Sequence, residues 1–162
     1  MDTKHDVDRS EILGLVAAWG RALEARDIDG LMAHYAPDAV IYDCVAWNVR
    51  MGPAELRGIW ESCLPHFPAA LRSEHRDLDV TVGGDVAFVH GMHHMIPDDP
   101  AHPCGQTWMR VTLCFRRIDG RWRAVHEHTS VPFDPMSGRI VNITDPDAAL
   151  PAFEPCAAGE QP

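Results

Sequence analysis

The chain has 162 residues, a formal charge of −10 at pH 7 and a hydrophobic content of 46%. That length is typical of one domain with a sizeable core, and the hydrophobic content excludes an intrinsically disordered chain. Because nucleic acids and anionic membranes are bound by clustered Lys and Arg, the acidic balance argues against both as partners.

Cysteine usage and the chain start indicate the compartment. The five cysteines are an odd number, spread along the chain without a C-x-x-C pair. This pattern favours a reducing compartment and gives no indication of a zinc site. The first six residues are polar, and no apolar run reaches transmembrane length. The sequence therefore predicts a cytoplasmic protein with no membrane segment.

The first half of the chain predicts three helices. Apolar residues at helical spacing predict an amphipathic helix over residues 8–26. Asp27 can cap a shorter second helix that continues through Tyr35, and residues 36–38 end it. Gly52-Pro53 begins a third helix, with proline in its first turn. Its expected apolar face consists of Leu56, Ile59, Trp60, Cys63 and Phe67.

Strand patterns follow the second helix and then dominate from Leu71 onward. Residues 39–45 predict one strand, and a short second strand is expected around residues 47–50. Later segments alternate with a period of two, and Gly83-Gly84 and Asp119-Gly120 predict hairpin turns between them. The strands expected there cover residues 74–82, 86–96, 107–118 and 122–131.

These elements predict an α+β fold in which three N-terminal helices pack on one face of a strongly curved, mostly antiparallel sheet. Such a sheet encloses a cone whose interior can hold a ligand. We expect one domain over residues 1–133 and a C-terminal extension over residues 134–162. The extension is rich in Pro, Asp and Ala, and only residues 140–143 are expected to dock, as a short strand.

Asp43 is the residue that most directly suggests a function, because it places one carboxylate within the apolar segment 39–45. Burying a carboxylate without a partner is strongly unfavourable. A carboxylate held where it exchanges a proton near neutral pH is a candidate general base. The alternative from the local pattern is a side chain that faces solvent at the strand end.

Four segments, in this order, resemble the NTF2-like superfamily, and specifically its SnoaL-like and ketosteroid-isomerase-like branch. They are RDIDGLM at 26–32, YAPDAV at 35–40, GPAEL at 52–56 and RIDGRWRAVHEHTS at 117–130. The resemblance implies the cone-shaped fold and a homodimer formed through the convex sheet face. It is weak for function, because this fold hosts isomerases, cyclases, dehydratases, hydrolases and non-catalytic association modules.

The resemblance places Asp43 where ketosteroid isomerases keep the aspartate that shuttles the proton, and so implies that Asp43 faces the pocket. Their oxyanion-hole donors are not retained. Trp19 stands at the position of the tyrosine donor, and Leu113 stands at the position of the protonated aspartate. An indole N–H still donates a hydrogen bond, whereas leucine does not. Steroid isomerisation itself is therefore not expected.

Alternation along the last strand separates two faces, one with Val125, Glu127 and Thr129 and the other with His126 and His128. The family register implies that the first set faces the pocket and that the histidines lie on the convex face. Glu127 is then a second pocket carboxylate.

Two alternatives remain for this strand. Glu127 can instead form a structural salt bridge, with Arg110 or Arg116 as the partner. A bulge near Pro132 would exchange the two faces and bring the histidines of the strand into the pocket.

The segment 86–96 carries Phe88, His90, Met92 and His94 on one face, and the family register implies that this face lines the pocket. His90 is the candidate there for a catalytic or substrate-orienting group, since an imidazole gives and takes protons near pH 7. The alternative is a histidine that is hydrogen-bonded in the core or at the rim of the cone, and we prefer it for His94.

The ten histidines do not predict a metal site. His90 and His94 lie about 13 Å apart along one strand at ~3.3 Å per residue, too far to share an ion. His126 and His128 are about 7 Å apart, a workable spacing, but no third ligand is evident. Dinucleotide-binding, P-loop and G-x-S-x-G patterns are missing, so no cofactor is expected.

The function predicted is a cofactor-independent enzyme that transfers protons on a small apolar carbonyl compound. It would act as an isomerase, cyclase or lyase, for example in polyketide or terpenoid metabolism. Asp43 would take a proton next to the carbonyl, and His90 or Glu127 would return it or orient the substrate. Trp19 would donate to the developing oxyanion.

A wall suited to a polycyclic or aromatic ligand is expected from Trp19, Trp60, Met109, Val111 and Phe115, although each is also explained as ordinary core. The complete set of substrate-binding residues expected is Trp19, Tyr35, Trp60, Met92, His94, Met109, Val111, Val125 and Thr129. The alternative function is a non-catalytic ligand-binding or association module, because residues 122–130 also resemble the terminal strand of kinase-association domains.

Overall fold

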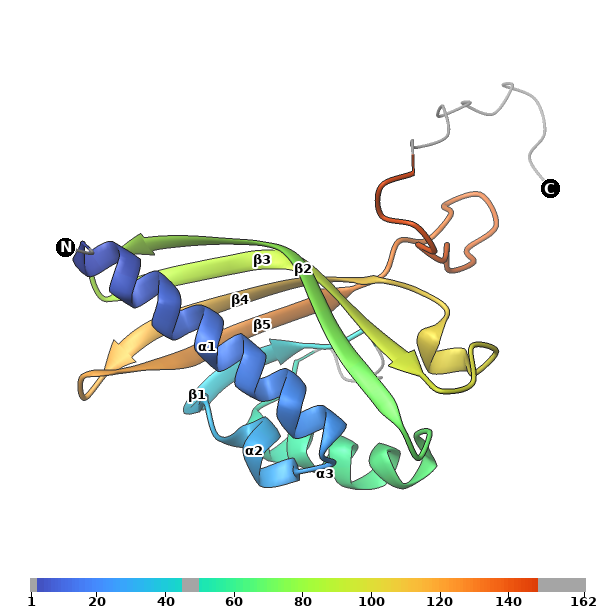
Figure 1. Cartoon of the computed structure of the whole chain (residues 1–162), viewed down its shortest axis with the longest axis horizontal. Coiled ribbons are helices and arrows are strands. Elements are labelled where there is room, and N and C mark those ends of the chain that lie inside the picture. The colour runs from blue at the N-terminus through green and yellow to red at the C-terminus, as the bar shows by residue number, and fades with distance from the viewer. Residues whose placement is uncertain (1–2, 45–49, 149–162) are drawn as a thin grey trace.

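Three helices lie together on one side of a curved five-stranded sheet in the computed structural model, which describes residues 3–44 and 50–148 (Figure 1). The helices are α1 (Lys4–Glu24), α2 (Ile28–Met32) and α3 (Pro53–Cys63), with 3-10 turns η1 (Leu64–His66) and η2 (Pro103–Gly105). The strands are β1 (Tyr35–Tyr42), β2 (Leu71–Gly83), β3 (Val86–Pro97), β4 (Met109–Ile118) and β5 (Arg121–Ser130). This confirms the predicted α+β architecture.

The sheet has the order β1-β5-β4-β3-β2. Strands β2 to β5 form an antiparallel meander, and β1 is parallel to β5 at one edge. Helix α1 crosses the concave face and buries Ile12, Val16 and Leu23 completely or almost completely. Within the described residues, none of the helices combines the length and apolar character needed to cross a bilayer.

Strand β1 begins earlier than predicted, and the expected extension of the second helix through Tyr35 is wrong. Helix α2 is capped by Asp27, whose carboxylate accepts a bond from the Gly30 N–H at 3.0 Å, but it ends at Met32. Pro37 lies in the strand, where an edge position tolerates its missing N–H. The short strand expected around residues 47–50 lies almost entirely outside the described residues. Tyr35 is thereby placed on the sheet.

The β4–β5 hairpin turns at its predicted residues, whereas the β2–β3 turn lies one residue later than the predicted Gly83-Gly84. The turn between β2 and β3 consists of Gly84 and Asp85, with φ +62° at Gly84. The turn between β4 and β5 consists of Asp119 and Gly120, with φ +50° and +76°. The β4–β5 turn thus has positive φ at both central residues, the geometry that matches the right-handed twist of the flanking strands.

A bulge in β2 helps to bend the sheet over the helices. The register with β3 shifts between Arg76 and Asp79, and Asp77 has φ +54°. Gly91 of β3 lies against this bulge, where a Cβ atom would come within 2.9 Å of the Arg76 carbonyl oxygen and 2.8 Å of Leu78 Cδ2. Glycine is therefore required for the backbone to approach so closely.

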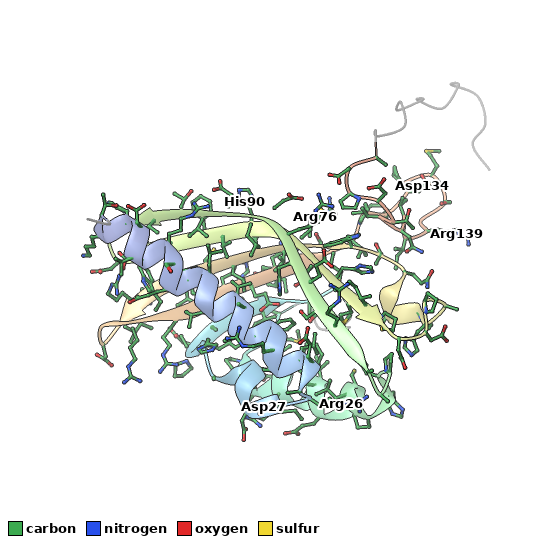
Figure 2. The ribbon with its side chains drawn as sticks, in the orientation of Figure 1. Arg26, Asp27, Arg76, His90, Asp134 and Arg139 are labelled. Carbon is green, nitrogen blue, oxygen red and sulfur yellow. The ribbon has the colours of Figure 1, made fainter. Side chains whose placement is uncertain are left out.

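Part of the C-terminal extension docks on the domain. The Trp108 N–H donates to the Ile143 carbonyl at 2.9 Å, and the Arg76 guanidinium contacts both carboxylate oxygens of Asp147 at 3.0 Å. The short strand expected at residues 140–143 is reduced to a single bridge between Phe133 and Ile140. Figure 2 shows Asp134 and Arg139 on a loop that projects from the sheet. The domain boundary at residue 133 stays a prediction.

Two glycine substitutions test this account of the sheet with opposite expected signs. Gly91→Ala should lower the free energy of unfolding by about 1–3 kcal/mol, because the new methyl meets backbone and Leu78. Gly58→Ala in α3 should raise it by about 0.5–1 kcal/mol, because nothing lies within 4 Å of that site and alanine favours a helix. Chemical denaturation measures both. A Gly91→Ala protein as stable as the wild type would contradict the close approach.

Candidate functional site

A cavity of about 110 Å³ lies between the helices and the concave face of the sheet. Its lining is predominantly apolar and aromatic. All five residues expected to form the apolar wall lie in it, and they are joined by Phe67 from the segment after η1. The Trp19 and Trp60 rings pack edge to face, with centroids 5.9 Å apart. An apolar cavity of roughly 150 Å³ binds benzene, so a cavity of about 110 Å³ holds at most a single ring.

Two carboxylates open into this cavity, those of Asp43 and Glu127. Asp43 follows the end of β1, and Glu127 lies on β5, the strand with which β1 pairs. No Lys or Arg is present among the described residues that line the cavity. The salt bridge considered for Glu127 with Arg110 or Arg116 is not formed in the described structure.

Glu127 is held by two hydroxyl groups instead of a cation. The Tyr35 hydroxyl donates to Glu127 Oε2, and Thr129 Oγ1 donates to Oε1 at 3.3 Å. Burial raises the pKa of Glu127, the two hydrogen bonds lower it, and the negative charge of Asp43 raises it further. The balance lies above the ordinary value. Glu127 is therefore protonated more readily than an exposed glutamate.

Tyr35 remains a proton donor in this arrangement. Burial and then the charge of Glu127 raise the pKa of the Tyr35 hydroxyl well above its ordinary value. A phenol with a raised pKa keeps its proton at neutral pH. Tyr35, which was expected among the substrate-binding residues, lines the cavity from the start of β1 and donates to Glu127 there.

The predicted pocket face of β3 is wrong. Val89, His93 and Met95 are 1%, 5% and 8% exposed, and the last two line the cavity. His90 has a side chain 55% exposed, lies 3.8 Å from a carboxylate oxygen of Asp79, and points away from the helices (Figure 2). The wrong face was predicted to point into the pocket because both faces of this strand carry apolar side chains and histidines.

The other residues of the predicted β3 face also lie away from the cavity. His94 Nε2 lies 2.9 Å from the Gly105 carbonyl, and its ring packs on Trp108 at 4.8 Å, in agreement with the preferred structural interpretation. Met92 and Phe88 are not among the cavity-lining residues.

Strand β5 contains a bulge, but not at the position considered near Pro132. The register with β4 shifts so that Cys114 pairs with His126 while Phe115 pairs with Ala124. Val125 is the extra residue, so Ala124 replaces it in the cavity lining and Glu127 with Thr129 keep their predicted inward direction. The expectation that Val125 lines the pocket is therefore wrong.

The histidines of β5 lie on the side opposite the cavity. The His126 ring lies 5.1 Å from the Tyr42 ring, and its Nδ1 is 2.7 Å from the Val40 carbonyl oxygen. His128 also packs edge to face on Tyr42, at 5.9 Å. In the described part of the chain, no group of three or more His, Cys, Asp or Glu side chains is arranged to hold a metal ion. The predicted homodimer through this face stays a prediction.

Three histidines of the cavity were missed from the sequence: His34, His75 and His93. Burial lowers the pKa of His93 to about 3 and that of His75 to about 4. The pairing of His75 with His93 follows from the predicted β2–β3 hairpin only after the bulge in β2 is included. The apolar residues Val89 and Met95 lie on the same face of β3 as His93 and could have indicated that this face is buried. The opposite face carries as many apolar residues, so alternation alone did not favour either one.

Comparisons with known proteins place this architecture among characterised folds. A family model described as a SnoaL-like domain matches residues 12–134. An NTF2-like protein of unknown function from Pseudomonas putida is 31% identical, with 86% of this chain and 97% of that chain covered and a TM-score of 0.78. A candidate dehydratase of the NTF2-like family from Streptomyces avermitilis is 19% identical, with coverage of 77% and 96% and a TM-score of 0.64. No curated protein matches.

The buried histidines predict a destabilisation by acid. An unfolded histidine titrates near 6.5, so below that pH the unfolded chain binds protons that folded His75 and His93 do not. The free energy of unfolding should therefore fall as the pH is lowered from about 6.5 towards 4. Glu127 acts in the opposite direction, since its raised pKa makes the folded state bind that proton first.

His75→Gln isolates the histidine contribution. Urea unfolding at about pH 7 and pH 5 should show a smaller loss of stability for this variant than for the wild type. His90→Gln, at an exposed site, is the control and should keep the wild-type pH dependence. Equal losses in wild type and His75→Gln would show that this ring is not held neutral.

Tyr35→Phe tests the hydroxyl bond to Glu127. Removing the donor takes away the largest influence that lowers the pKa of the carboxyl, so that pKa should rise. Carbon NMR titration of the labelled glutamate carboxyls measures it, with Glu127→Gln to assign the resonance. Tyr42→Phe, on the outer side of the sheet, is the matched control. An unchanged Glu127 titration in Tyr35→Phe would contradict the bond.

Proposed function

The chain belongs to the SnoaL-like domain family, with the NTF2-like fold, and on that premise we propose that its pocket is the active site of a cofactor-independent proton-transfer enzyme. The observation that supports this most strongly is the pair of carboxylates, Asp43 and Glu127, that opens into a small apolar cavity without a neutralising cation in its described lining. Coupled carboxylates in such a site are suited to acid–base work.

The two acids are assigned different roles. Asp43 takes a proton from the carbon next to a ligand carbonyl, and the electron pair moves into the carbonyl to form an enolate. Glu127, whose pKa is raised by burial and by the charge of Asp43, supplies a proton at a second position of the ligand. The proton on Asp43 then returns to Glu127 through solvent, so that no net change of protonation remains.

The described lining favours a ligand of modest size and low polarity. A cavity of about 110 Å³ walled by indole, phenyl and thioether groups suits one ring and disfavours the polycyclic compounds considered from the sequence. The candidate dehydratase among the related folds is compatible with elimination, but at 19% identity it supports the fold alone.

A single-ring ketone, β,γ-cyclohexenone, tests the proposal. It can exchange the proton next to its carbonyl with solvent, and it becomes the conjugated isomer when that proton is lost and another is added at the far carbon of its double bond. Asp43→Asn should lower kcat by roughly a hundredfold or more while leaving probe binding nearly unchanged, because the amide cannot accept the proton. Asp38→Asn, an exposed residue of the same strand, should keep wild-type turnover.

Glu127→Gln extends the test to the second acid. It should slow formation of the conjugated isomer more than loss of the first proton, which deuterium exchange reports separately. Glu61→Gln, exposed on α3, is its control. Proton exchange that is equal in the wild type and Asp43→Asn, with the probe bound by both, would favour the alternative of a non-catalytic ligand-binding module.

A further inference from the structure

Two stacked imidazoles form a part of the cavity that the proposed proton transfer does not use. His75 of β2 and His93 of β3 are register partners, and their rings lie 4.5 Å apart at an angle of 22°. The Trp19 ring contacts both edge to face, at 6.0 and 5.3 Å. Both histidines line the cavity, from β2 and β3, whereas the carboxylates come from β5 and the end of β1.

The hydrogen bonds of this pair are incomplete. His93 is only 5% exposed, and its Nε2 lies 3.0 Å from Ser73 Oγ, while Ser73 itself does not line the cavity. Among the described residues, neither His93 Nδ1 nor either ring nitrogen of His75 has a hydrogen-bond partner. None of these three nitrogens is fully enclosed by neighbouring atoms, so a ligand in the cavity can supply the missing partner.

These nitrogens differ from the other unpartnered donors of the cavity wall. The indole nitrogens of Trp19 and Trp60 also lack partners, but they are fully enclosed by neighbouring atoms. The unpartnered imidazole nitrogens are not among the enclosed atoms. Of the two kinds of donor, the imidazoles are therefore the ones that a ligand in the cavity can reach without rearrangement.

The charges of the cavity-lining residues determine which kind of ligand can bind beside His75 and His93. Burial lowers the pKa of His75 to about 4 and that of His93 to about 3, so both rings are neutral at pH 7 and each has one N–H donor. His34, the third histidine of the lining, also has a pKa lowered by burial. With two carboxylates and no Lys or Arg in the described lining, an anionic ligand meets no compensating positive charge.

We propose that the His75–His93 pair is the recognition site for the uncharged oxygen of a single-ring carbonyl or hydroxyl compound, and that the cavity rejects carboxylates and phosphates of the same shape. In this proposal Ser73 is a positioning residue: its hydroxyl donates to Nε2 of His93, which leaves the ring proton on Nδ1, where it can face the ligand. This inference rests on the pocket assigned above and names the substrate class that it takes.

Three aromatic probes of nearly the same shape test the inference on the wild-type protein at pH 7. Acetophenone has a carbonyl acceptor, isopropylbenzene has none, and benzoate is anionic. Acetophenone should bind about fivefold more tightly than isopropylbenzene, the contribution of one neutral hydrogen bond. Benzoate should show no binding at concentrations that saturate with acetophenone. Calorimetry measures the affinities, and the fluorescence of the cavity tryptophans gives an independent reading.

Substitution of each imidazole by a flat apolar ring locates the donor. His75→Phe and His93→Phe keep the stacked arrangement, and at least one of them should bring the affinity ratio of acetophenone to isopropylbenzene down to about one. His90→Phe, on the outer side of the sheet, is the matched control and should keep the wild-type ratio. Ser73→Ala leaves the cavity lining intact, and should reduce the ratio even if the His93 variant fails to fold.

The carbonyl band of bound acetophenone provides a signature that a structural role would not change. In the wild type the infrared band should lie at lower frequency than in an alkane solvent, because a hydrogen-bond donor polarises the carbonyl. In the imidazole variants the band should move back to the frequency that it has in the alkane. A ratio that stays at the wild-type value in His75→Phe, His93→Phe and Ser73→Ala overturns the inference, as does absence of acetophenone binding or equal binding of benzoate.

The two proposals fail separately. The probes bind without proton transfer, so selective binding of acetophenone by a protein that shows no exchange of cyclohexenone would refute only the proposed function. Proton exchange of cyclohexenone that depends on Asp43, together with equal affinities of the wild type for acetophenone and isopropylbenzene, would refute only the role of the His75–His93 pair.

Discussion

The hydrogen bond from the Tyr35 hydroxyl to the Glu127 carboxylate joins the edge strand β1 to β5 inside the cavity. β5 is the only strand that neighbours β1 in the described sheet, so this bond adds to the backbone pairing that holds the strand whose end precedes Asp43. It also lets a carboxylate be buried where no described lining residue is a cation, since hydroxyl donors replace part of the lost hydration. The raised pKa of Glu127 and its coupling to Asp43 both follow from this arrangement.

Curvature of the sheet gives the cavity two chemically different walls. The bulge in β2 against Gly91 and the bulge at Val125 in β5 bend the strands over the helices. The carboxylates then lie on the side of β1 and β5, the imidazoles on the side of β2 and β3, and apolar side chains of α1, α3 and β4 between them. Burial acts on both walls in the same way, because it favours the uncharged form of each group.

Much of the fold was predictable, because its signals are local. Asp27 as a helix cap, Gly52-Pro53 as a helix start and Asp119-Gly120 as a turn all act through their own backbone conformation. Features that depend on contacts distant in sequence were predicted less well. Tyr35 was assigned to a helix because its strand exists only by pairing with β5. The face of β3 was assigned wrongly because apolar side chains occur in both phases.

The sequence by itself determined the order of helices and strands, the approximate turns and the candidacy of Asp43, whereas the inward direction of Glu127 was implied by the family register. The tertiary structure alone decided which groups share the cavity: Tyr35 with Glu127, and His75 with His93. The reason is that a bulge inserts a single residue and reverses the direction of the side chains beyond it, while alternation in sequence remains the same. Which polar groups are desolvated together is thus set by register, and register is a property of paired strands.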